Sequence, residues 1–215
     1  MWSFDAITSI SWLEAIKTLA SLATAAIAFF ALRNWQRQDK AKREAEFLDA
    51  LIEAAHSYIA EVPGLAMLCS MAKIGMESHA PTWENCDDAD KAVKGAIAYI
   101  EKRGEQDAKR LRDMLEAVQP STIKLRSLAA KGQIFKFDDY TKCHAAVAML
   151  TWHYDRFGAF ATVIGSPTWN WENIEVLRLL KDIMAIDLAD ISKSIEENNV
   201  AIIEFARKTY TRIYG

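Results

Sequence analysis

The segment TLASLATAAIAFFAL, residues 18–32, contains no charged side chain and decides how this chain is organised. It corresponds to roughly 22 Å of α-helix at 1.5 Å per residue. A helix that crosses a bilayer needs about 20 residues, so a membrane span here would have to extend upstream to Ile10. That extension includes Glu14 and Lys17, which are three residues apart and can form an ion pair on one helix face. The segment therefore predicts a helix that is able to span a membrane.

The residues on either side of this segment are typical of a membrane-spanning helix. Trp12 and Trp35 bracket it, and they would lie about 34 Å apart along a helix. This separation matches the hydrocarbon thickness plus an interfacial margin, where tryptophan prefers to lie. Lys17 is near enough to the helix end to extend its ammonium group toward the lipid headgroups. Five basic residues follow the apolar segment closely and are called the basic cluster: Arg33, Arg37, Lys40, Lys42 and Arg43. Because Lys and Arg accumulate on the cytoplasmic side, we expect a single-pass protein whose C-terminal bulk is cytoplasmic.

Two other interpretations of the apolar segment have to be weighed. A cleaved signal peptide fits poorly, because residues 1–13 carry only Asp5 where a signal peptide has a basic region. A helix buried inside a soluble bundle would be equally apolar, and it would pair Glu14 with Lys17 without penalty. The membrane anchor is the interpretation that the flanking tryptophans and basic residues favour.

Two features of this region bear on what the helix contacts. Ala20, Thr24 and Ala28 are spaced four residues apart, and helices in lipid approach one another closely through such small residues. They are therefore candidates for self-association. The basic cluster either contacts anionic lipid or forms a solvated helix face, since acidic residues are interleaved with it: Asp39, Glu44 and Glu46.

The start of the chain also resembles a known group of proteins. An apolar helix containing Thr18 and Thr24 ends on a Trp-x-x-Gln element, Trp35 and Gln38, and a charged helix follows over residues 39–47. This pattern resembles the start of small uncharacterised bacterial inner-membrane proteins that have one N-terminal anchor helix and a cytoplasmic helical region. The resemblance covers only about the first fifty residues. It implies a location in the bacterial inner membrane, and it implies no activity and no site.

The rest of the chain is predicted to be helical. Apolar residues recur at helical spacing after the basic cluster: Phe47, Leu48, Leu51, Ile52, Ala55, Tyr58 and Ile59. We expect this helix to end at Pro63-Gly64. Further helices are expected over residues 65–77, 88–104, 105–130 and 138–165, with a kink or break at Pro120. The last of these is apolar nearly all round, which predicts a place in the middle of a bundle.

Residues 171–214 contain neither Pro nor Gly and predict a long final helix. Seven of its positions step alternately by four and three residues: Met184, Leu188, Ile191, Ile195, Asn198, Ile202 and Phe205. This spacing is typical of a heptad seam with one polar member. The seam belongs either to a bundle within one chain or to a coiled coil between chains, in which Asn198 would set the register or the number of chains.

The predicted fold class is therefore all-α. With only 8 Gly and 4 Pro in 215 residues, a turn-rich β-sandwich is disfavoured. We expect an N-terminal transmembrane helix within residues 1–35 and a cytoplasmic helical bundle over residues 36–215. The first and last helices of that bundle are expected to be long.

Composition and motifs exclude several classes of function. The net charge of -3 gives no electrostatic footprint for nucleic acid. No glycine-rich phosphate loop and no nucleophile elbow occurs. The strongest metal candidate is Glu53-x-x-His56, a pair that carboxylate-bridged di-iron bundles supply twice. Because this sequence supplies it once, we expect no metal and no cofactor.

These observations favour a non-enzymatic, membrane-anchored helical interaction protein. Its partners would be the lipid bilayer and either a protein partner or a second copy of itself. The first alternative is an effector that oligomerises through its anchors and perturbs the bilayer. The second is a soluble helical metal-binding protein or enzyme centred on Glu53 and His56.

Overall fold

A computed structural model describes residues 5–82 and 87–215, with side chains from Trp12 onward. Its elements in chain order are α1 (Asp5–Ser78), α2 (Asp88–Tyr99), the π-helix η1 (Ile100–Gly104), α3 (Glu105–Phe135), α4 (Tyr140–Ile164), α5 (Ile174–Met184) and α6 (Leu188–Tyr214). No strand occurs in these described ranges. The all-α prediction is therefore confirmed for this part of the chain.

The chain divides into two compact units, residues 1–46 and 47–215. Helix α1 contributes to both of them. The first unit contains the apolar segment and the basic cluster. The second unit contains the remainder of α1 and all the other described helices.

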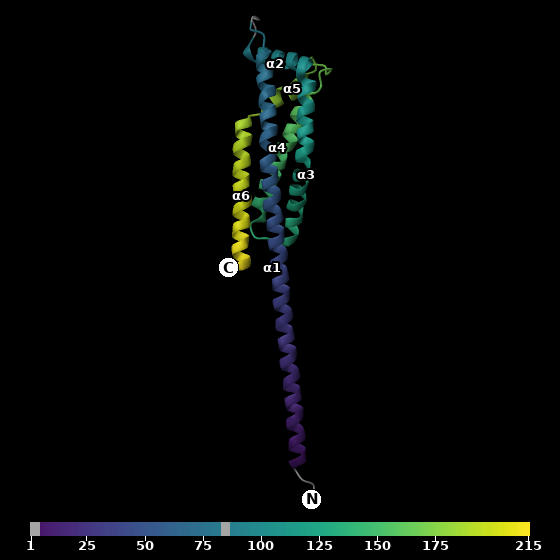
Figure 1. Ribbon diagram of the computed structural model, residues 1–215, viewed down its shortest axis with the longest axis vertical. Coiled ribbons are helices and arrows are strands. Elements are labelled where there is room, and N and C mark those ends of the chain that lie inside the picture. The colour runs from purple at the N-terminus through teal and green to yellow at the C-terminus, as the bar shows by residue number, and fades with distance from the viewer. Residues whose placement is uncertain (1–4, 83–86) are drawn as a thin grey trace. The chain divides into compact units, whose positions relative to one another are not determined.

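In the second unit, α3, α4 and α6 run alongside the C-terminal part of α1, and α2 and α5 lie near the end where α1 finishes (Figure 1). The amphipathic stripe that begins at Phe47 supplies the α1 side of the core. The largest fully buried side chains come from all of these helices except α2 and α6: Tyr58, Phe157, Phe160, Leu48, Leu51, Leu65, Ile100, Leu111, Leu125, Leu150, Ile164 and Leu180. Burial of each such side chain contributes about 1.5–3 kcal/mol.

The predicted end of the first amphipathic helix at Pro63-Gly64 is wrong, because α1 continues through Pro63 to Ser78. Val62 and Leu65 are both fully buried on either side of the proline. Pro63 itself is exposed. Packing of the neighbouring turns therefore outweighs the roughly 3 kcal/mol that proline costs inside a helix.

The predicted stop at Gly104 is also wrong. Helix α2 passes through η1 directly into α3. Gly104 is buried, and a Cβ atom added there would lie 2.1 Å from the carbonyl oxygen of Ile164. The glycine allows η1 to cross the end of α4 closely and does not terminate a helix. The break considered at Pro120 is absent as well, because Pro120 lies exposed within α3, which continues from Glu105 to Phe135.

The expectation that α4 lies in the middle of the bundle is wrong for one of its faces. Trp152 is 49% exposed and Met149 is 39% exposed. The guanidinium of Arg156 lies over the Trp152 ring, 4.8 Å from its centroid. The opposite face is buried, with Leu150 and Phe157 fully enclosed. The sequence of α4 is apolar on all faces because it is rich in alanine, although the other helices bury only one of these faces.

The predicted long final helix is two helices, α5 and α6, and the break between them contains neither Pro nor Gly. Asp187 is the reason, because its carboxylate accepts hydrogen bonds from the backbone N–H groups of Ala189 (2.8 Å) and Asp190 (3.2 Å). This is an N-cap, which starts a new helix. The predicted seam is therefore interrupted after Met184. On α6 its members Ile191, Ile202 and Phe205 are buried within their own chain, and α6 packs against α4.

Candidate functional site

The apolar part of the first unit is exposed on every side. All side chains from Trp12 to Gln38 are exposed. The large apolar ones range from 53% exposure at Leu32 to 71% at Trp12, and the others are Leu13, Ile16, Leu19, Leu22, Ile27, Phe29, Phe30 and Trp35. Among the described residues, α1 is the helix that is long and apolar enough to cross a membrane. None of its most apolar window is buried.

The hydroxyl groups of this helix are bonded within the helix itself. Thr18 Oγ1 donates to the Glu14 carbonyl at 2.8 Å, and Ser21 Oγ donates to the Lys17 carbonyl at 2.9 Å. Thr24 Oγ1 donates in the same way to the Ala20 carbonyl at 2.9 Å. Each donor is therefore satisfied without water, which is what a hydrocarbon environment requires of polar groups.

The ion pair that the spacing of Glu14 and Lys17 allows is not formed among the described residues. Both side chains are exposed, where an ion pair contributes at most about 1 kcal/mol against the entropy of fixing two long side chains. Lys17 therefore has its ammonium group free to reach away from the apolar surface, as expected for a residue near a membrane interface.

The basic cluster separates into two parts. Lys40, Lys42 and Arg43 each pair with an acidic residue one turn away on α1: Lys40 with Glu44 at 3.6 Å, Lys42 with Glu46 at 3.9 Å, and Arg43 with Asp39. Arg33 and Arg37 have no ion-pair partner among residues 12–82 and 87–215. They are four residues apart and so lie on one helix face. The positive charge that is not neutralised by a partner is therefore next to the apolar segment.

Ala20, Thr24 and Ala28 lie along one face of α1, and all three are exposed. The Thr24 hydroxyl is already bonded to the Ala20 carbonyl. The stripe therefore offers a smooth surface for close approach, with no hydroxyl donor left over for a bond to another helix.

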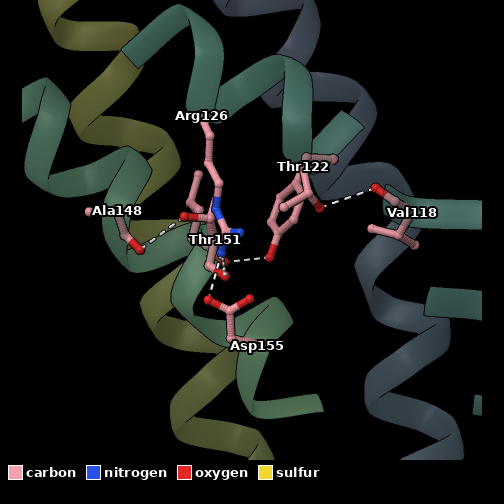
Figure 2. Close-up of polar contacts among 8 residues, drawn as sticks. Val118, Thr122, Arg126, Ala148, Thr151 and Asp155 are labelled. Atoms are coloured by element: carbon pink, nitrogen blue, oxygen red, sulfur yellow. Dashed lines mark hydrogen bonds and ion pairs between the residues drawn. The ribbon is translucent and has the colours of Figure 1, made fainter. Parts of the chain in front are cut away.

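In the second unit, polar side chains bond backbone carbonyls across helices (Figure 2). Arg126 Nη2 on α3 donates to the Thr151 carbonyl of α4 at 3.1 Å and to the Asp155 carboxylate at 2.6 Å. Within α3, the Thr122 hydroxyl donates to the Val118 carbonyl at 3.1 Å. These contacts join α3 to α4 and do not place a nucleophile beside a free base.

Two tyrosines extend this arrangement. The Tyr58 hydroxyl of α1 donates to the Leu150 carbonyl of α4, and the Tyr154 hydroxyl of α4 donates to the Leu115 carbonyl of α3 at 3.1 Å. Tyr58 is fully buried, and desolvation raises the pKa of its phenol well above the ordinary value. Both phenols therefore act as hydrogen-bond donors that join α1, α3 and α4.

Asn198, the polar member of the predicted seam, belongs to an interface within the chain. Its Nδ2 donates to the Ser194 carbonyl at 2.7 Å and to Ser194 Oγ at 3.2 Å. Ser194 Oγ lies 2.9 Å from Nε2 of His153 on α4. His153 is 2% exposed, and its Nδ1 is buried without a hydrogen-bond partner. Desolvation, with a smaller effect of the Arg156 charge, lowers the pKa of His153.

The metal candidates Glu53 and His56 are not brought together with other ligands. Glu53 pairs with Lys124 of α3 at 2.9 Å, and His56 is exposed. Over the part of the chain that the structure describes, no group of three or more His, Cys, Asp or Glu side chains could hold a metal ion. The Glu53-x-x-His56 spacing therefore gains no further ligand from the fold.

Sequence reasoning did not find the cross-helix contacts of Arg126, Tyr58 or His153. Arg126 and Asp155 are 29 residues apart and Tyr58 and Leu150 are 92 apart, so no linear motif joins them. The one local signal is the position of Tyr58 on the apolar stripe of α1, because a buried phenol needs a hydrogen-bond partner.

Comparison with protein-family models, with curated proteins and with solved structures finds no match to this chain.

Proposed function

We propose that this chain is a non-enzymatic, membrane-tethered interaction protein. Residues 12–35 of α1 cross a bacterial inner membrane once, and residues 47–215 form a cytoplasmic bundle that binds a protein partner or a second copy of itself. The observation that carries this proposal is the exposure of every side chain from Trp12 to Gln38.

Lipid is the environment that best accounts for this surface. Soluble monomers rarely expose contiguous apolar patches larger than a few hundred Å², and larger ones mark membrane or protein contacts. Here the apolar side chains surround the helix and do not form a single stripe, so a helix packed on one side only would leave most of them in water. The hydroxyls of Thr18, Ser21 and Thr24 are satisfied within the helix, which removes the main polar cost of burial in hydrocarbon.

The orientation follows from Arg33 and Arg37. Their charges are not paired within the described chain, and they come directly after the apolar segment. Basic residues flanking a span are retained on the cytoplasmic side, where each adds about 1 kcal/mol of attraction to anionic headgroups. The second unit therefore lies in the cytoplasm in this proposal.

A charge placed in the middle of the segment tests the proposal. Ala26→Arg costs about 2.5–3.5 kcal/mol in insertion at the centre of a span, so the protein should shift from the membrane fraction to the soluble or aggregated fraction of bacterial cells. Ala148→Arg adds the same charge at an exposed position on α4 and should leave the distribution unchanged. Equal distributions for the two variants would contradict membrane insertion.

The second candidate function is an effector that assembles in the bilayer. The exposed small-residue stripe at Ala20, Thr24 and Ala28 favours it. Chemical crosslinking of the full chain in membranes distinguishes it from a simple tether. An effector gives oligomers that disappear in the Ala20→Leu, Ala28→Leu double variant, whereas a tether gives the same crosslinking pattern in both proteins.

A further inference from the structure

A cavity of about 230 Å³ in the second unit lies where the end of α1 meets the α2–η1–α3 path. From α1 it is lined by Leu68, Met71, Gly75 and Ser78, and His79 follows at the end of that helix. Tyr99, Arg103, Asp107 and Arg110 line the other side. None of these side chains belongs to the apolar segment or the basic cluster, so binding in the cavity does not depend on the proposed tether.

The fold brings the polar side chains to one place for two reasons. Tyr99, Arg103, Asp107 and Arg110 recur at spacings of four, four and three residues, so they share a face of the continuous helical path. Gly75 lets that face approach α1, because a Cβ atom there would lie 2.5 Å from Cε2 of the Tyr99 ring. The π-turn that carries Arg103 is itself a rare element that occurs often at functional sites.

Asp107 accepts a hydrogen bond at each of its two carboxylate oxygens. The Tyr99 hydroxyl donates to Asp107 Oδ2 at 2.7 Å, and Arg110 Nη1 donates to Oδ1 at 3.2 Å. These bonds use the one carboxylate of the cavity and leave the other guanidinium nitrogens of Arg110 available. Arg103 has no ion-pair partner among the described residues. The two guanidinium groups against one carboxylate leave the cavity with a net positive charge.

His79 adds a further polar atom. Its Nδ1 lies 2.7 Å from the Gly75 carbonyl oxygen, and because a carbonyl only accepts, Nδ1 carries the proton. Nε2 then has no hydrogen-bond partner within residues 12–82 and 87–215. The ring lies edge-to-face with Tyr99, with centroids 5.9 Å apart, so its position is fixed by contacts on two sides.

The α1 side of the cavity also carries two apolar side chains, Leu68 and Met71. Leu68 is half-buried, and Met71 is 59% exposed. An occupant would therefore contact apolar side chains of α1 and the guanidinium groups of η1 and α3. The volume is below the roughly 300–1,000 Å³ of a drug-sized site, which limits the occupant to a small molecule or to one end of a larger one.

We propose that this cavity binds a phosphate monoester, with the phosphate held by Arg103 and Arg110 beside His79 and its organic part against Leu68 and Met71. Arginine suits this role because its planar guanidinium presents several donors that match phosphate oxygens. The phosphate can belong to a free metabolite or to a lipid headgroup, and the experiment separates the two sources.

The test uses the full chain in neutral detergent, with binding measured by calorimetry. Phenyl phosphate and inorganic phosphate represent free ligands, and phosphatidic acid in mixed micelles represents a lipid phosphate monoester. We expect saturable binding of phenyl phosphate or of phosphatidic acid, and whichever binds identifies the source. Phenyl phosphate should bind more tightly than inorganic phosphate if the apolar side chains of α1 contribute, and equal affinities would overturn that part of the proposal.

Variants locate the binding. Arg103→Gln should weaken binding about 10–100-fold, the effect of losing a charged hydrogen bond, and Arg103→Lys should restore it in part. Lys131→Gln removes one positive charge from an exposed position elsewhere on α3 and should change affinity less than twofold. Absence of saturable binding by every probe, or equal weakening by the Arg103→Gln and Lys131→Gln variants, overturns the proposal.

Discussion

Replacing Gly104 with alanine should destabilise the second unit, whereas the same replacement at Gly158 should stabilise it. Both glycines lie within helical segments. They differ in what a Cβ atom would meet. At Gly104 it would lie 2.1 Å from the Ile164 carbonyl oxygen, and at Gly158 nothing lies within 4 Å.

The magnitudes follow from this difference. Alanine gains roughly 1 kcal/mol over glycine in a helix interior, so Gly158→Ala should add about 0.5–1 kcal/mol to the free energy of unfolding. At Gly104 the obstacle is backbone, which cannot rotate away as a side chain would. Forcing η1 and the end of α4 apart costs the upper end of the usual range of about 1–3 kcal/mol for overpacking. After subtraction of the helix gain, the net loss at Gly104 is about 2 kcal/mol.

Thermal unfolding of the full chain, followed by circular dichroism in neutral detergent, measures both effects. At about 2–4 °C per kcal/mol for a unit of this size, Gly104→Ala should lower the Tm by roughly 4–8 °C and Gly158→Ala should raise it by roughly 1–4 °C. A Gly104→Ala protein as stable as the parent would refute the close crossing of η1 and α4. It would also mean that the helical path continues through residue 104 for a reason other than the missing side chain.

Three further predictions concern the polar contacts of the bundle. Because the pKa of His153 is lowered in the folded state, the unfolded chain binds the proton first, and stability should fall as the pH drops below about 6.5. The fall in Tm between about pH 7.5 and pH 5.5, on either side of the ordinary histidine pKa, should be smaller for His153→Gln than for the parent protein. An equal fall in the two proteins would show that His153 does not cause the pH dependence of stability. Tyr58→Phe removes the buried hydroxyl that donates to a carbonyl and should lower the free energy of unfolding by about 1–2 kcal/mol. Tyr214→Phe, at an exposed position, should change it by less than about 0.5 kcal/mol. Equal unfolding free energies for the two variants would show that the buried hydrogen bond does not stabilise the fold. A double-mutant cycle with Arg126→Gln and Asp155→Asn should give a coupling below about 1 kcal/mol, because both side chains are about half exposed, and a larger coupling would mean that this pair is shielded from solvent.

The sequence predicts the elements whose signals are local. The uncharged run over residues 18–32 and the stripe that begins at Phe47 both indicate helix, and both lie in α1. The N-cap at Asp187 also has a local signal, since Asp is a strong helix start, but the unbroken heptad spacing across it favours a single helix.

The errors come from residues whose effect depends on distant packing. Proline and glycine predict helix ends at Pro63 and Gly104, where buried neighbours instead hold the helix together. The contacts of Arg126 and His153 join residues on different helices and leave no trace in the local pattern. The cavity at Arg103 has no sequence signal for the same reason, because His79 and Arg103 line one cavity only when α1 and η1 are packed.

Alkaline carbonate extraction of membranes from bacteria that produce the full chain tests the proposed membrane insertion most directly. A protein held by a transmembrane helix should remain in the membrane pellet at high pH, because its apolar side chains from Trp12 to Trp35 are surrounded by lipid. Release of the folded chain into the supernatant would contradict insertion and show that this helix is covered by protein.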